Sequence, residues 1–258
     1  TKLLPVIMFS IVLAAALTTV GEKGKVVLDF FSGLNEAMMK LVVWLMYFAP
    51  IGIFSLISTR LAKAGGADEF LNEVTAVGLH IVTVISGLAI HFLILFSILF
   101  VITKRGRKYL TGMLRALFTA FGTASSSATL PLTMECIKEQ GVDDKSSKFV
   151  VPLGSTINMD GTALYEACAV MFIAQAYGME MSFYQQVIIF LTATLAAIGA
   201  AGIPEAGLVT MVIVLEAVGI PLDGIALLLA VDWFLDRFRT TVNVWGDAVG
   251  AAIVERMK

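Results

Sequence analysis

The sequence predicts an all-α membrane protein with two re-entrant helical hairpins that enter from opposite faces, together with a broken transmembrane helix. Its 258 residues are 58% hydrophobic and only 15% charged, with a mean hydropathy of +0.89. Soluble domains carry about 25% charged residues. Besides this composition, two observations support the prediction: long charge-free runs, and two apolar segments that are interrupted at their centres. A net charge of −2 gives no attraction for nucleic acid.

Three charge-free runs predict membrane-spanning helices. Leu3–Gly21, Leu41–Thr59 and Val74–Thr103 contain 19, 19 and 30 residues. A helix needs about 20 apolar residues to cross the ~30 Å hydrocarbon core. The amphipathic stretch Glu22–Lys40 is expected to connect the first two spans.

Two later apolar segments are interrupted at their centres. Ala116–Met134 contains a run of hydroxyl residues and Pro131, and Met181–Leu215 contains a Gly-Ala-rich centre with Pro204 and Glu205. Each pattern predicts two short helices joined at a tip. The expected elements are a hairpin at about 112–140, a broken helix at 148–179, a hairpin at about 183–219 and a polar-faced last helix at 223–256.

Basic residues predict the orientation of the chain. If both hairpins return to their own side, thirteen Lys and Arg residues lie on one side of the membrane and three on the other. The positive-inside rule assigns the first side to the cytoplasm. We therefore expect a multi-pass protein of the plasma membrane with a cytoplasmic C-terminus.

The last helix carries a row of polar residues on one face. Asp232, Asp236, Arg239, Asn243 and Asp247 are spaced by 4, 3, 4 and 4 residues, which places them on the same side of a helix. Charges at membrane depth are costly and mark functional sites. The row is either an internal ion-pair network or a face that holds an amine, a carboxylate and metal ions.

A second polar cluster interrupts the preceding helix. The sequence Asn158-Met-Asp-Gly-Thr162 favours local unwinding at Gly161. Freed carbonyls and the Asp160 carboxylate form a set of oxygen ligands suited to hard cations. Six residues further on, Glu166 either carries a proton or makes a hydrogen bond to a neighbouring helix.

Two further polar sets have open interpretations. The hydroxyls of Ser125, Ser126 and Ser127 either bind a ligand or satisfy carbonyl groups of their own loop. His80 and His91 share a face of the long third span, and neither has a carboxylate or cysteine nearby in the sequence. We interpret both histidines as packed neutral rings rather than ligands.

Four motifs in order resemble the glutamate transporter family, the sodium-coupled dicarboxylate and amino-acid symporters. They are Thr123–Pro131, Asn158–Thr162, Ala201–Gly207 and Asp236–Asn243. The resemblance covers the whole chain and corresponds to the C-terminal part of the family, whose earlier helices are missing, which suggests a fragment. It implies residues 1–73 as part of a homotrimer scaffold and residues 74–258 as a mobile, elevator-type transport domain.

The resemblance also implies site residues. Asp236 would accept the substrate's α-amino group, Arg239 with Thr162 its side-chain carboxylate, and Asn243 with Ser126 its α-carboxylate. The implied substrate-binding residues are Ser125, Ser126, Thr162, Ile203, Gly207, Asp236, Arg239, Thr240 and Asn243. The implied sodium ligands are Gly154, Thr156, Asn158, Met159, Asp160, Ala197, Ile198, Ala200, Asn243 and Asp247. Asp232 would orient Arg239, and Glu166 would couple transport to proton and potassium.

Arg239 and Glu166 favour the branch that carries acidic amino acids, because neutral carriers lack an arginine and have glutamine at the matching positions. The resemblance therefore implies glutamate or aspartate symport with sodium, proton co-transport and potassium counter-transport, and no organic cofactor. Glu205 departs from the excitatory transporters, which usually have glutamine there. The alternatives are a neutral amino-acid or dicarboxylate carrier, then a channel. An intramembrane hydrolase is not favoured, since neither histidine lies in a protease motif.

Overall fold

The computed structural model describes residues 3–48, 51–52, 54–55, 58–59, 67–200, 202 and 204–257, and the described residues form helices without strands. The chain divides into two compact units, Thr1–Phe70 and Leu71–Lys258. This all-helical architecture confirms the predicted helical class. Each unit is described by itself.

The described residues of the first unit include the helices α1 (Leu3–Thr19) and α2 (Glu22–Met46), which pack against each other. Gly21 lies between them in the left-handed region with φ +68°. The predicted connector is not a separate segment: α2 runs through it and into the first six residues of the predicted second span. The remainder of that run includes positions outside the described residues.

The second unit begins within α4, the longest helix. Its stretch Leu71–Thr103 is the one helix among the described residues that is long and apolar enough to cross a membrane by itself. The elements are α4 (Ala67–Thr103), α5 (Arg107–Thr123), α6 (Ser126–Glu139), α7 (Asp144–Ile157), α8 (Asp160–Ala176), α9 (Phe183–Ile198), α10 (Ala206–Val218), the 3₁₀ helix η1 (Leu222–Leu227) and α11 (Leu229–Arg256).

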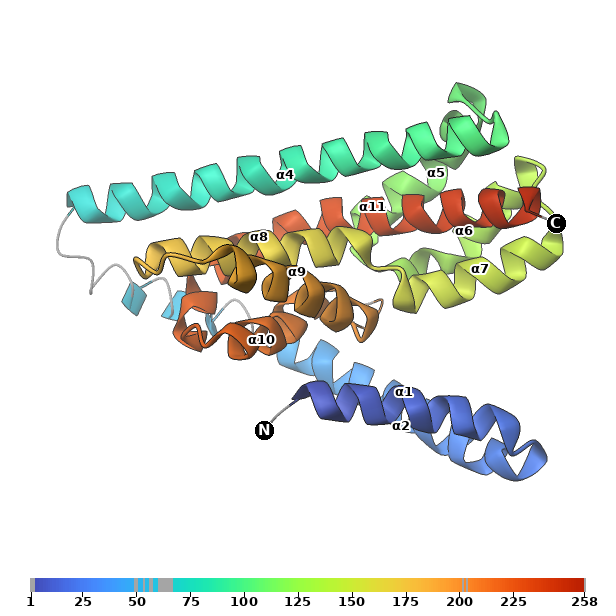
Figure 1. The fold of residues 1–258 in the computed structure, drawn as a ribbon, viewed down its shortest axis with the longest axis horizontal. Coiled ribbons are helices and arrows are strands. Elements are labelled where there is room, and N and C mark those ends of the chain that lie inside the picture. Colours follow the sequence, from blue (N-terminus) through green and yellow to red (C-terminus); the bar gives the residue numbers. More distant parts are fainter. Residues whose placement is uncertain are drawn as a thin grey trace. The chain divides into compact units, whose positions relative to one another are not determined.

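Helix α11 forms the centre of this unit and packs against α5, α6, α7 and α8 (Figure 1). Helices α5 and α6 form one antiparallel pair, and α9 and α10 form the other. The first pair begins at Arg107, five residues earlier than expected. The last helix is preceded by a 3₁₀ turn where the sequence predicted one continuous helix from residue 223.

Helix ends in this unit follow local side-chain chemistry. Ser125 caps α6 by accepting from the Ala128 amide, and Ser182 forms a capping box with Gln185 at the start of α9. Gly219 ends α10 in the left-handed conformation with φ +71°. These caps fix where each short helix of a pair stops, and therefore where the tips lie.

The core of the second unit is built around Trp245. Its ring stacks on Phe92 of α4 with a centroid distance of 5.1 Å, and its Nε1 donates to the Phe92 carbonyl at 3.3 Å. The Tyr109 hydroxyl donates to the Ala248 carbonyl at 2.8 Å. Contacts from α4 and α5 thereby fix the position of α11, which carries the polar row.

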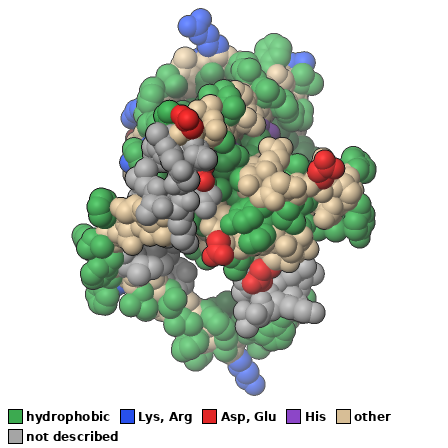
Figure 2. Space-filling view, turned by 90° about the vertical axis from the view of Figure 1, so that its left-hand side faces the viewer, with side chains coloured by type: hydrophobic (Ala, Val, Ile, Leu, Met, Phe, Trp, Pro, Cys, Tyr) green, Lys and Arg blue, Asp and Glu red, His purple; other side chains and the backbone are tan. Residues whose placement is uncertain are grey.

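The surface is rich in exposed apolar side chains. On α4, the side chains of Leu79, Leu93 and Val101 are 61–65% exposed. Figure 2 shows hydrophobic side chains over much of one face, with acidic groups near its centre and basic groups at its edges. Soluble monomers rarely expose large apolar patches, so this surface matches an apolar solvent such as the bilayer interior.

Candidate functional site

The tips of the two helix pairs meet. The Ser125 hydroxyl and the Ser127 amide, both at the first tip, donate to the Gly202 carbonyl of the second tip, at 2.6 and 3.1 Å. A Cβ on Gly202 would lie 2.5 Å from the Ser155 carbonyl oxygen, so glycine is required by close approach. The Ser125 hydroxyl therefore bonds backbone of the opposite tip in this structure, rather than a carbonyl group of its own loop.

Each tip contains a non-glycine residue in the left-handed region. Ala124 ends α5 with φ +49°, and Glu205 precedes α10 with φ +61°. Such backbone is uncommon outside glycine and clusters at ligand clamps and switch regions. The two tips therefore have the strained backbone that is common where a chain binds a ligand.

A small polar cavity lies under the tips. Its volume is about 10 Å³, roughly what a cavity needs to hold a single water molecule. An amino acid enters this space only if the tips move apart. The cavity is lined by Ala124, Ser126, Met159, Thr162, Ala200, Gly202, Ala206, Gly207, Asp236, Thr240 and Asn243.

Arg239 forms a buried ion-pair network beside this cavity. Its guanidinium donates to both oxygens of Asp232, at 2.9 and 3.3 Å, and its Nη2 lies 2.7 Å from Asp236 Oδ1. The Arg239 carbon Cζ lies 4.0 Å from the centre of the Tyr165 ring. Arg239 and Asp232 have no exposed surface. The first three residues of the polar row thus form an ion-pair network in this structure, with two carboxylates around one guanidinium.

The second tip packs directly on this network. The Glu205 amide donates to Asp236 Oδ2 at 2.7 Å. A Cβ on Gly207 would lie 2.8 Å from Arg239 Nη1, so glycine at this position lets the tip backbone pack closely against the guanidinium. Ile203, the other tip residue expected to contact substrate, lies outside the described residues.

Asn243 joins α11 to the break between α7 and α8. Its Oδ1 accepts from the Gly161 amide at 2.8 Å, and its Nδ2 donates to Thr162 Oγ1 at 3.2 Å. Two residues, Asn158 and Met159, separate the helices, with ψ of +64° and +53°. The break expected from the Asn-Met-Asp-Gly-Thr sequence therefore lies against the polar row.

A second carboxylate cluster lies one turn further along α11. Asn158 Nδ2 donates to Asp247 Oδ1 at 3.0 Å, and Asp247 is 2% exposed. A Cβ on Gly154 would collide with the Asp247 carboxylate. Gly154, Asn158 and Asp247, three of the expected sodium ligands, are thus brought together.

The other expected ligands are less uniformly placed. Met159 packs with Ala197 and Ala200 of the second tip region. Thr156 is exposed and donates to the Leu153 carbonyl at 2.9 Å, and Ile198 is 37% exposed. Within the described part of the chain, no three His, Cys, Asp or Glu side chains gather around one metal position. A cation here would rely on a single carboxylate together with amide, hydroxyl and backbone oxygens.

His91 is the residue that the sequence interpretation misjudged. Its Nε2 lies 2.6 Å from Asp160 Oδ2, although the two residues are 69 positions apart. The only available sequence signal was a histidine in the middle of a charge-free span. His80 is packed as expected, 4% exposed against Phe172.

Glu166 is fully buried and accepts a hydrogen bond from the Thr210 hydroxyl of α10. Its other oxygen, Oε2, has no hydrogen-bond partner within the described residues. The structure thus has the helix-to-helix hydrogen bond that was one of two sequence interpretations, and leaves one carboxyl oxygen available. Thr210 was not predicted as part of the site.

Ionisable groups buried in apolar helices, where two helix pairs meet tip to tip, are typical of secondary transporters. Comparison with known families agrees: residues 1–257 match the sodium:dicarboxylate symporter family. The chain belongs to this family, which confirms the resemblance drawn from its motifs and places it with transporters rather than enzymes.

The similar proteins are excitatory amino acid transporters. The chain is 51% identical over 257 residues to excitatory amino acid transporter 1 of Ambystoma tigrinum, covering 98% of this chain and 47% of that protein. It is 50% identical over 259 residues to excitatory amino acid transporter 3 of Mus musculus, covering 99% and 49%. The Caenorhabditis elegans transporter is 48% identical over 256 residues, covering 98% and 50%. The chain spans about half the length of these relatives.

Proposed function

We propose that this chain forms the substrate-binding and ion-coupling part of a sodium-coupled symporter of acidic amino acids. The observation that carries the proposal is Arg239, a guanidinium with no exposed surface that is covered by Gly207 of the second tip. Arginine binds carboxylates in a bidentate geometry. An acidic amino acid has a side-chain carboxylate for the guanidinium to bind in addition to its α-carboxylate, whereas a neutral one has only the α-carboxylate.

Substrate binding would exchange internal partners for substrate groups. When the tips part, Asp236 releases the Glu205 amide and becomes available for an ammonium group. The guanidinium of Arg239 then exchanges part of its contact with Asp236 for the substrate's side-chain carboxylate, while Asp232 keeps it oriented. Ser126 and Asn243 line the same cavity and would hold the α-carboxylate, and Thr162 would assist Arg239 with the side-chain carboxylate; Thr240 lines the cavity as well.

Sodium ions would bind to the oxygen atoms around the break between α7 and α8. Asp247, Asn158 and Gly154 form one group, and Asp160 with Asn158 another. The backbone near Ala197 and Ala200, beside Met159, offers a third. Oxygen ligands of this kind suit hard cations. Glu166 is the group we assign to proton and potassium coupling.

The larger architecture is also part of the proposal. Residues 1–73 would belong to a trimeric scaffold and residues 74–258 to the moving transport domain of a plasma-membrane protein with a cytoplasmic C-terminus. Helices α5–α6 and α9–α10 would be the re-entrant hairpins, and α7–α8 the broken helix. Their tip-to-tip contact at Gly202 supports entry from opposite faces.

Uptake into liposomes tests the proposal. The reconstituted protein should accumulate L-glutamate and L-aspartate only with an inward sodium gradient. Alanine, serine and succinate, offered in parallel, test the neutral amino-acid and dicarboxylate alternatives. Sodium-independent uptake, or preference for a neutral amino acid, would contradict the proposal.

Glu166→Gln should separate exchange from net transport. The amide keeps the size of the side chain and can still bond Thr210, but it cannot carry a proton. We expect exchange of external for internal amino acid to continue, while potassium-driven net uptake and its pH dependence are lost. Thr210→Val, which removes the partner and keeps the carboxyl group, is the control and should retain pH-dependent uptake. Unchanged net uptake in Glu166→Gln would remove the proposed role.

His91→Phe should weaken sodium activation of substrate binding. It removes the side chain that contacts Asp160 Oδ2, and hydrogen bonds to charged groups contribute about 1.5–3 kcal/mol. We expect the sodium concentration for half-maximal substrate binding to rise about tenfold. His91→Gln, which keeps a donor, should lie closer to wild type. Equal sodium dependence in all three proteins would show that the contact is not used.

A further inference from the structure

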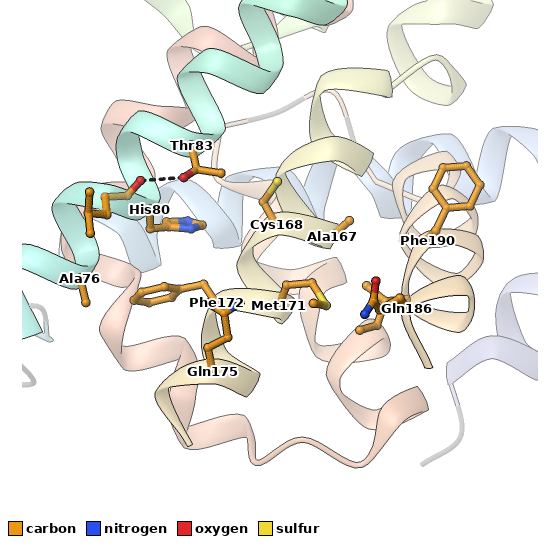
Figure 3. A pocket seen from close by; sticks show the side chains of 12 residues that line it. Ala76, His80, Thr83, Ala167, Cys168, Met171, Phe172, Gln175, Gln186 and Phe190 are labelled. Atoms are coloured by element: carbon orange, nitrogen blue, oxygen red, sulfur yellow. Dashed lines mark hydrogen bonds between the residues drawn. The ribbon is translucent and has the colours of Figure 1, made fainter. Parts of the chain in front are cut away.

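A second cavity lies away from the tips, between α4, α8 and α9 (Figure 3). Its volume is about 490 Å³, within the ~300–1,000 Å³ typical of small-molecule sites. It shares no lining residue with the substrate cavity. Its walls belong to α8, which carries Glu166, and to α9, which leads to the second tip.

The lining of this cavity has no charged side chain and is mostly apolar. Two of its polar side chains already have partners: Thr83 Oγ1 donates to the Leu79 carbonyl at 2.9 Å, and Gln186 Nε2 donates to the Met181 carbonyl at 3.0 Å. An ionic ligand would be poorly solvated here. The cavity therefore suits a neutral molecule with an apolar body.

His80 is the buried polar side chain of this lining. It is 4% exposed, its ring lies 4.7 Å from the Phe172 ring, and its Nε2 has no hydrogen-bond partner within the described residues. A buried nitrogen without a partner destabilises the folded protein. A hydroxyl group satisfies either tautomer of the ring, because it both donates and accepts. A carbonyl group would serve only one of them.

The rim of the cavity is also apolar. Leu79 of α4 and Phe190 of α9 are both 64% exposed, so the cavity is reached from the same apolar surface that suits the bilayer. We propose that this cavity binds a neutral, membrane-dissolved alcohol whose apolar body fills the space and whose hydroxyl group bonds His80 Nε2. The site is separate from substrate and sodium binding and does not depend on the proposed transport activity.

Photolabelling in lipid nanodiscs tests this site. The probes are an octanol that carries a diazirine and the matching diazirine octane without the hydroxyl. The alcohol should label peptides of α4, α8 and α9, and unlabelled octanol should compete. The alkane should label the same peptides about two- to tenfold more weakly, the value of one neutral hydrogen bond. Equal labelling by both probes, or no competable labelling of these peptides, would overturn the proposal.

Three variants sharpen the result. His80→Phe should lower alcohol labelling to the level of the alkane and leave alkane labelling unchanged. Thr83→Val is the matched control, because its hydroxyl already bonds Leu79, and it should label as wild type. Ala76→Trp places a bulky ring in the cavity and should abolish labelling by both probes. Labelling that survives Ala76→Trp contradicts the site. If His80→Phe does not fold, the comparison of the two probes on the wild-type protein still decides whether the hydroxyl group contributes to binding.

Discussion

Arg239→Cys is expected to lower the affinity for glutamate and aspartate by two to four decades. The guanidinium is fully buried, and in our proposal it is the group that pairs with the substrate's side-chain carboxylate. Removing one partner of a buried, hydrogen-bonded charge pair costs about 3–5 kcal/mol. The shortened side chain also leaves space beside Gly207, so serine and alanine are expected to bind. Substrate Kd, measured by calorimetry in sodium, checks both results.

The structure shows why this variant needs a partner experiment. Arg239 also neutralises Asp232 and Asp236, so its loss leaves two carboxylates facing each other. Asp232→Asn, added to Arg239→Cys, removes that repulsion. The double variant still has no guanidinium to bind the substrate's side-chain carboxylate. If Arg239 binds the substrate's side-chain carboxylate, the double variant also fails to bind glutamate. Arg115→Cys, at an exposed arginine on α5, should bind as wild type. Glutamate binding within tenfold of wild type in Arg239→Cys would contradict the assignment.

The polar row on α11 is the part of the site that the sequence predicts best. Helical spacing alone places Asp232, Asp236, Arg239, Asn243 and Asp247 on one face, and all five are buried in the structure. A charged residue in an apolar segment strongly indicates a functional site, because placing the charge in the membrane costs free energy. Interrupted hydropathy likewise predicts both helix pairs, since Gly, Pro and hydroxyl residues weaken a continuous helix.

Contacts between distant segments are what the sequence alone cannot supply. His91 meets Asp160 across 69 residues, and Thr210 meets Glu166 across 44. Periodicity tells which residues share a face of one helix, but not which face of another helix they meet. His91 therefore looked like a packed ring, and Thr210 looked like an ordinary helix residue.

Element boundaries fail for a related reason. The predicted connector before Lys40 continues as α2 to Met46, because nothing in that stretch caps or breaks a helix. Conversely, the chain before Leu229 forms a 3₁₀ turn after Pro221, although its residues are as apolar as those of the helix that follows. Hydropathy predicts burial in the membrane, and capping decides where a helix ends.

Asp247→Asn is expected to flatten the dependence of substrate affinity on sodium. Asp247 is 2% exposed, and its Oδ1 accepts a hydrogen bond from Asn158 at 3.0 Å. Its carboxylate can therefore hold a cation beside Asn243, one of the proposed substrate ligands. An amide keeps the shape and can still accept from Asn158, but it lacks the charge. Each ion that favours the binding-competent state adds to the coupling with substrate. We expect about tenfold or greater loss of sodium affinity, the scale of a charge-assisted contact.

The measurement is substrate Kd against sodium concentration for wild type, Asp247→Asn and two companions. Gly154→Ala should give the same flattening by a steric route, because its Cβ would fall on the Asp247 carboxylate. Asp223→Asn, at an exposed position in η1, removes the same charge away from the site and should leave the slope unchanged. Equal slopes for Asp247→Asn and wild type would take Asp247 out of the sodium site. A wild-type Kd indifferent to sodium would overturn the symport proposal, because the ion and the substrate would then bind without coupling.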